Sequence, residues 1–231
     1  MTVWEHLAQL RRLLFWVVGS VVLAAGCVHY WREPVITFLL QPLGDTQAPL
    51  QFLSPLDPLY FILKIDFTLG LLLSLPFILC IVWRYIAPAV SLRWYTPLLV
   101  GTLITILSGL AMAYAYLLVV PIILAFMSSI VIPGTATAFT ASGYLSFLLT
   151  TTSILVLVFQ IPLILATLCL LRLMTPAYIR QHRPYFHIGA LVLAAIVTPT
   201  TDIFTLGLVA GPAIVAIELG AVLGSLVSRN Q

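Results

Sequence analysis

Apolar residues are gathered into six runs along the chain, and short polar segments separate them. A run of about 20 apolar residues forms a helix long enough to cross the roughly 30 Å hydrocarbon core of a bilayer. The pattern therefore predicts six membrane-spanning helices, at residues 13–31, 59–83, 97–127, 144–171, 187–197 and 203–227. The fifth run has only about ten residues, or roughly 15 Å of helix, so we expect it to thin the bilayer locally.

Prolines mark both the ends and the interiors of these runs. Pro199 lies in the polar break between the fifth and sixth runs, and Pro76, Pro121, Pro162 and Pro212 each place a kink within a predicted span. With the unequal lengths of the spans, these kinks predict an all-α polytopic membrane protein, a cupped six-helix bundle that forms one domain over residues 1–231.

A short interfacial helix is expected before the first span. Thr2 and Glu5 have the spacing of a capping box, and Val3, Trp4, Leu7 and Leu10 share one face of the turns that follow. The segment therefore has an apolar side for the membrane surface and a polar side for the aqueous phase.

Composition excludes several classes of protein. The chain is 62% hydrophobic and 7% charged, and no polar segment is long enough for a catalytic or nucleic-acid-binding domain. Its three cysteines are far apart, and it has no Ser/His/Asp set, no paired histidines at metal spacing and no Gly-rich phosphate loop. We therefore expect no enzyme activity, no metal, no cofactor and no nucleic-acid partner.

Basic residues predict the orientation in the membrane. Eight of the ten Lys and Arg residues follow even-numbered spans or lie at the termini. Cytoplasmic segments carry the excess of Lys and Arg, so both termini are expected on the cytoplasmic side, or the stromal side in a thylakoid.

Charged groups within apolar runs require a partner, a water-filled cavity or a function. Lys64 and Asp66 are two positions apart, which on a helix point in different directions, so they are not natural partners of each other. Two interpretations stay open: Lys64 extends outward while Asp66 meets a polar group of another span, or both take part in transport.

The last span also contains an acid. Glu218 lies roughly 24 Å along the helix from Asp202, which is a candidate N-cap, as are Thr200 and Thr201. Glu218 is either an acid packed against a neighbouring helix or a functional residue. In the fourth span the amide of Gln160 is expected to link helices.

Several motifs together resemble the TatC family, the multispanning receptor core of the twin-arginine protein translocase. They are His6-Leu7-Ala8-Gln9-Leu10-Arg11, Pro55-Leu56-Asp57 with Leu63-Lys64, Tyr85-Ile86-Ala87-Pro88, Ala115-Tyr116 with Pro121, Tyr144-Leu145-Ser146-Phe147, Phe159-Gln160-Ile161-Pro162, and Thr198-Pro199-Thr200-Thr201-Asp202 with Pro212 and Glu218. The resemblance covers nearly the whole chain.

The resemblance implies a signal-peptide receptor and assembly core that exports folded proteins. It implies an oligomeric complex with TatA- and TatB-type single-span proteins, in a plasma (inner) membrane or a thylakoid membrane. The implied signal-binding rim comprises Glu5, His6, Gln9, Arg11, Tyr85, Arg93 and Trp94. The implied polar contacts with partner helices comprise Lys64, Asp66, Tyr116, Gln160, Asp202 and Glu218.

The chain departs from the family at the two glutamates that recognise the arginine pair. Gln9 and Trp94 stand in their places, and Arg93 lies beside the second. A carboxylate accepts a charge-assisted bidentate contact from a guanidinium, whereas an amide offers a neutral acceptor and an arginine repels. Trp94 can stack on a guanidinium and Glu5, one turn from Gln9, can supply a displaced carboxylate.

Two alternative functions remain. The first is an ion-coupled small-solute transporter that uses Lys64, Asp66, Gln160 and Glu218. The second is a non-transporting TatC-like paralogue or scaffold, which assembles with partner helices but exports nothing.

Overall fold

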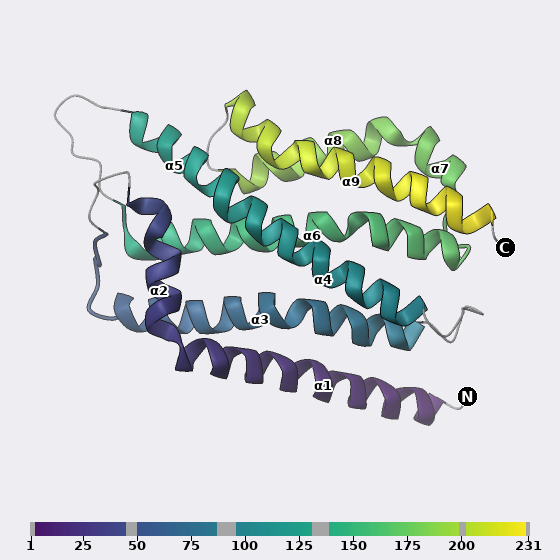
Figure 1. Ribbon diagram of the computed structural model, residues 1–231, viewed down its shortest axis with the longest axis horizontal. Helices are drawn as coiled ribbons and strands as arrows, with labels where there is room; N and C mark the ends of the chain where they lie inside the picture. Colours follow the sequence, from purple (N-terminus) through teal and green to yellow (C-terminus); the bar gives the residue numbers. More distant parts are fainter. Residues whose placement is uncertain (1–2, 45–49, 87–95, 131–138, 199–201, 230–231) are drawn as a thin grey trace. The chain divides into compact units, whose positions relative to one another are not determined.

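The computed structural model describes residues 3–44, 50–86, 96–130, 139–198 and 202–229, and these ranges are almost entirely helical (Figure 1). The chain divides into two compact units, residues 1–41 with 52–105, and residues 42–51 with 106–231. The single domain and the cupped arrangement of the spans stay predictions.

The first unit is built on an antiparallel pair, α1 (Val3–Tyr30) and α3 (Asp57–Ile86). A Cβ on Gly70 would meet the backbone of Ala25 within 3 Å, and His29 contacts Asp66 through their side chains. In each pair the two residue numbers add up to 95, which fixes the register. By the same register Arg11 is level with Arg84, at the opposite end of the pair.

This register defines the apolar thickness of the pair. The stretch between the arginines and the His29–Asp66 contact is about 18 residues on each helix, or roughly 27 Å. That length matches the hydrocarbon core of a bilayer.

The first unit also contains α2 (Arg32–Leu40), which turns sharply away from the end of α1 (Figure 1), and the start of α4 (Thr96–Tyr114).

The second unit packs the later helices around α6 (Ala141–Leu170). It contains most of the short 3₁₀ helix η1 (Gln41–Leu43), the end of α4, the π-helical segment η3 (Ala115–Val119), α5 (Val120–Ser129), α7 (Pro176–Gln181), α8 (Arg183–Val197) and α9 (Ile203–Arg229). Its core includes a buried cluster of Ala115, Val119, Ile123, Leu155, Ala194, Val209 and Ala210.

α6 and α9 lie side by side and run in the same direction. Glycines on α9 allow the two helices to approach closely. A Cβ on Gly220 would lie 3.0 Å from Cβ of Leu165, and one on Gly224 would lie 3.4 Å from Cβ of Cys169. The residue numbers differ by 55 in both pairs, so Asp202 is level with Phe147. α9 therefore begins about seven residues, or roughly 10 Å, below the start of α6 at Thr140.

Five helical stretches are long and apolar enough to cross a membrane: Arg11–Tyr30, Asp57–Arg84, Leu98–Ser129, Ala141–Leu170 and Ile203–Val227. The fifth predicted span corresponds to α8, of 15 residues, whose apolar part Arg183–Ile196 is shorter than the other five. The prediction of an all-helical polytopic membrane protein is confirmed, and the count of six crossings stays a prediction.

Two local predictions differ from the structure. The proline-containing segment after residue 31 was expected to be a connection, yet α2 forms there, because Pro34 lies in the first helical turn where its missing N–H is not needed. The N-terminal segment was expected to be a separate interfacial helix. Its backbone is instead continuous with the first span from Val3 onward.

Candidate functional site

The predicted rim is placed only in part by the described residues. Glu5, His6 and Gln9 lie in the first turns of α1 and Tyr85 lies at the end of α3, while their side chains are outside the described part of the structure. Because Gln9 is level with Ile86 in the α1–α3 register, these two segments lie at the same end of the first unit.

The remaining positions of the predicted rim are Arg11, Arg93 and Trp94. Arg11 is exposed, and Arg84 is exposed at the same level of the pair. Arg93 and Trp94 lie outside the described residues. The backbone therefore brings the α1 and α3 parts of the rim together, and the contribution of the intervening loop stays a prediction.

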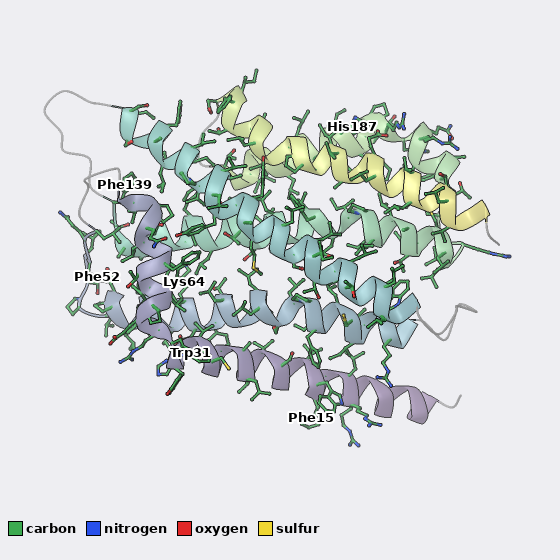
Figure 2. All side chains as sticks on the ribbon, in the orientation of Figure 1. Phe15, Trp31, Phe52, Lys64, Phe139 and His187 are labelled. Carbon is green, nitrogen blue, oxygen red and sulfur yellow. The ribbon has the colours of Figure 1, made fainter. Side chains whose placement is uncertain are left out.

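Asp66 meets a polar group of a neighbouring helix. Nδ1 of His29 donates to Oδ2 of Asp66 at 2.8 Å, and the Asp66 side chain is 12% exposed. Lys64 is exposed on another side of α3 (Figure 2). This arrangement agrees with the interpretation in which Lys64 extends outward and Asp66 is held by another span.

The His29–Asp66 contact also indicates where Asp66 lies along the membrane normal. His29 is followed in the chain by Tyr30 and Trp31, whose rings pack edge to face. Tyr and Trp are enriched at membrane–water interfaces. Asp66 is level with His29, so it lies near the interface and not in the middle of the bilayer. The first two turns of α3, with Lys64, then extend beyond the hydrocarbon core.

Gln160 is almost fully buried, at 2% exposure. Its Nε2 donates to Oγ of Ser108 at 3.1 Å, which joins α6 to α4 within the second unit. Among the described residues, Oε1 of Gln160 accepts no hydrogen bond. The amide therefore links helices of this chain, and it lies too deep to meet a partner helix unless α4 and α6 separate.

Tyr116 and Asp202 have local roles. Tyr116 is half-buried in η3, close enough to Tyr144 of α6 for an electrostatic interaction. Both carboxylate oxygens of Asp202 accept from the backbone N–H of Thr205 at 3.1 Å, and the Thr205 hydroxyl donates to Oδ1. Asp202 is therefore the N-cap of α9, the role that the sequence allowed.

Glu218 joins α9 to α8. Nη2 of Arg183 lies 2.6 Å from Oε2 of Glu218, and Nε2 of His187 lies 3.3 Å from Oε1. His187 projects from α8 (Figure 2). The Glu218 side chain is 35% exposed, so the acid is paired within the chain and still reachable from outside.

Sequence reasoning missed the four partners in these contacts: His29, Ser108, Arg183 and His187. Arg183 and His187 are four positions apart on one helix, a spacing that places two cations on one face, so an acid opposite them was foreseeable. His29 and Ser108 carry no such signal, because their partners depend on helix register.

A recess lies beyond the end of α8 in the second unit. It has a volume of about 560 Å³ and is lined by residues from the ends of α5, α6 and α8, among them Met127, Thr140, Phe147, Thr151 and Ile196. α6 lines the recess with its first turns, and α8 lines it with Ile196 near its last residue. Among the described residues no group of three or more His, Cys, Asp or Glu side chains is placed to hold a metal ion.

Comparison with known proteins gives one consistent answer. Residues 5–212 match the family model described as Sec-independent protein translocase protein (TatC). The chain is 30% identical to the TatC protein of Aquifex aeolicus, over 98% of this chain and 96% of the relative. It is also 30% identical to that of Escherichia coli K12, over 93% and 84%, and 27% identical to the TatCy protein of Bacillus subtilis, over 100% and 91%.

Solved structures agree. A crystal structure of the twin-arginine translocase receptor TatC superposes with a TM-score of 0.82 at 28% identity, covering 97% of this chain and 100% of that one. A second structure of the receptor, in the detergent DDM, gives a TM-score of 0.84 at 28% identity over 95% and 99% of the two chains.

Proposed function

The chain belongs to the TatC family, and from this premise we propose that it is the signal-peptide receptor and assembly core of a twin-arginine translocase. The observation that carries the proposal is the likeness to twin-arginine receptor structures over nearly the whole chain. The chain is a multi-pass membrane protein of a translocase family and not an enzyme.

The proposed orientation places both termini in the cytoplasm, in the inner membrane of a bacterium. Arg11, Arg12 and Arg84 then form the cytoplasmic boundary of the α1–α3 pair, and His29 with Asp66 forms the outer one. This arrangement fits the positive-inside rule and a hydrocarbon core of roughly 27 Å.

The proposed signal site is the rim formed by residues 3–12 and 84–96. The α1–α3 register supports it, because Gln9 and Ile86 are level at the basic end of the pair. Gln9 offers a neutral acceptor to the signal arginines, Trp94 offers its ring face, and Glu5 offers a carboxylate one turn away. We expect weaker recognition of the arginine pair than two glutamates would give.

The proposed partners are TatA- and TatB-type single-span proteins, in keeping with the translocase complex that the family implies. Glu218 is the accessible member of the intramembrane polar set, since its side chain is partly exposed while Gln160 is buried. We propose that a partner helix reaches Glu218 along the outer side of the α8–α9 contact. α9 begins below the start of α6, which supports local thinning of the bilayer at that end of the unit.

No structural observation favours the ion-coupled transporter. Asp66 lies near the interface and contacts His29, Gln160 is buried against Ser108, and Glu218 is paired with Arg183. A proton pathway needs titratable groups that face a shared water-filled cavity at depth. Each of these groups instead has a partner within its own unit.

Site-specific photocrosslinking from position 94 tests the receptor function. A precursor with a twin-arginine signal should crosslink, and the same precursor with Lys-Lys should not. A crosslinker at position 53, which is exposed near the start of α3 at the other end of the first unit, is the matched control. Equal crosslinks with both signals, or none, would favour the scaffold that has kept the fold and lost signal recognition.

A further inference from the structure

The corner between α7 and α8 carries an exposed stack of rings beside a cation. Tyr178 and His182 stack with ring centroids 4.0 Å apart, and the ring centroid of Tyr185 lies 5.9 Å from that of His182. Tyr178 and Tyr185 are 47% and 74% exposed, and Arg180, two positions after Tyr178, is exposed as well. These four residues are called the corner site below.

The hydrogen bonding of His182 fixes which ring nitrogen remains available. Its Nδ1 lies 3.0 Å from the carbonyl oxygen of Tyr178, and a carbonyl only accepts, so Nδ1 carries the proton. Nε2 is then the nitrogen left for a ligand. The imidazole therefore presents one defined polar atom at the rim of the stack.

The charge around the corner site is uncompensated within the described residues. Arg172, Arg180 and Arg183 lie at this end of the second unit, and the acid there, Glu218, is already paired with Arg183 and His187. Asp202 is at the opposite end of α9. Arg180 therefore has no ion pair among the described side chains, and the corner attracts an anion.

An apolar stripe continues from the corner along α8. Tyr185, Ile188, Val192 and Ile196 follow one another at helical spacing and are 74%, 57%, 54% and 78% exposed. The surface thus changes from cationic to aromatic to aliphatic along one line. That order matches a phospholipid from its phosphate through its glycerol ester region to its acyl chain.

We propose that the corner site binds the headgroup of an anionic phospholipid, with an acyl chain along the α8 stripe. Arg180 pairs with the phosphate, and the rings of Tyr178, His182 and Tyr185 cover the glycerol region. A basic patch at the cytoplasmic end of membrane helices is a recognised form of lipid site. The proposal rests on the proposed orientation only for the leaflet, because the binding chemistry is the same on either side.

Native mass spectrometry of the full-length protein, titrated with phosphatidylglycerol or phosphatidylethanolamine, tests the headgroup contact. Arg180→Gln should weaken phosphatidylglycerol binding by about fivefold, the scale of one basic residue at an anionic surface, and leave phosphatidylethanolamine binding unchanged. Arg12→Gln removes an exposed arginine at the basic end of the first unit and is the matched control. Equal losses in both variants would overturn the proposal, since they show a general charge effect.

Fluorescence quenching tests the acyl chain path. Tryptophan is placed at Ile188 on the stripe or at Val22, which is 64% exposed on α1, and the vesicles contain a small fraction of phosphatidylglycerol with brominated chains. Quenching at position 188 should exceed that at position 22, and Arg180→Gln should abolish the excess. Equal quenching at the two positions would overturn the proposal.

The test separates this proposal from the receptor function. Signal crosslinking from position 94 should be retained in Arg180→Gln, because Arg180 is not part of the signal rim. Loss of lipid binding with retained crosslinking supports both proposals. Retained lipid binding in Arg180→Gln overturns the lipid site and leaves the receptor proposal to its own experiment.

Discussion

The phenolic hydroxyl of Tyr114 donates a hydrogen bond of 2.9 Å to the main-chain carbonyl of Leu208. In a regular helix that carbonyl accepts from the N–H of residue 212, and residue 212 of α9 is a proline without an N–H. Tyr114 therefore satisfies the acceptor that Pro212 leaves open. A side chain from the end of α4 thus replaces one backbone bond in a helix nearly a hundred residues later.

Removing this hydroxyl tests the relationship. Tyr114→Phe should lower the unfolding free energy by about 1 kcal/mol, the scale of one hydrogen bond between membrane helices. The cost should shrink in a Pro212→Ala background, where residue 212 supplies its own N–H to the carbonyl. The measurement is a double-mutant cycle on the purified protein in bicelles, and an equal cost in both backgrounds would show that the hydroxyl does not replace the missing N–H.

The close approach of α1 and α3 depends on Gly70. An added Cβ would lie 2.8 Å from the backbone nitrogen of Ala25, which cannot move without shifting α1. Gly70→Ala should therefore destabilise the protein by about 1–3 kcal/mol, the usual range for overpacking. Gly26→Ala is the control, because nothing lies within 4 Å of its added Cβ. Thermal unfolding that is the same for both variants would contradict the α1–α3 register.

The polypeptide after α6 turns through a residue in the left-handed conformation. Arg172 has a φ of 59°, and the N–H of Leu173 donates to the carbonyl of Leu168 at 3.0 Å, as in a Schellman motif that usually carries glycine. Arg172→Gly should stabilise the protein by about 0.5–1 kcal/mol, since glycine adopts this conformation without a steric penalty. Arg180→Gly, inside α7, should instead destabilise it, and a melting temperature lowered by both changes would argue against strain at residue 172.

The contact between α8 and α9 predicts how Glu218 acts on partners. Glu218→Ala should reduce crosslinking of TatA- or TatB-type helices to α9, and Arg183→Ala should reduce it as well, because each leaves the other charge without its partner. If the ion pair acts as one unit, the double variant should be no worse than either single one. Unchanged crosslinking in Glu218→Ala, with export intact, would remove Glu218 from the partner site.

Much of this fold could be predicted from the sequence, because long runs of apolar residues identify membrane-spanning helices. The apolar runs gave the five long helices to within a few residues, and the break at Pro199 gave the short α8. α2 was missed because the proline-containing residues after Trp31 were left outside the predicted spans, although the first turn of a helix accepts proline.

Contacts between helices were less accessible to sequence reasoning. The acid at position 66 was recognised as needing a partner, yet only the α1–α3 register identifies His29 and moves the pair to the interface. Likewise, Glu218 was expected either to pack against a neighbouring helix or to contact a partner protein, and only the structure identifies Arg183 and His187 as its contacts. Pairing of this kind depends on helix rotation and relative height, which hydropathy alone does not encode.

The substitutions at the signal rim lead to the last prediction. Gln9 lies one turn after Glu5 on α1, level with the end of α3, and it offers a neutral acceptor where a glutamate would form a charged hydrogen bond. Gln9→Glu should strengthen binding of a twin-arginine signal peptide by about fivefold, since a charged hydrogen bond contributes roughly 1 kcal/mol more than a neutral one. Glu5→Gln should weaken it if Glu5 supplies the displaced carboxylate. The measurement is peptide affinity at fixed salt with a Lys-Lys peptide as control, and a Gln9→Glu gain that is equal for both peptides would mean that the rim attracts positive charge without reading the arginine pair.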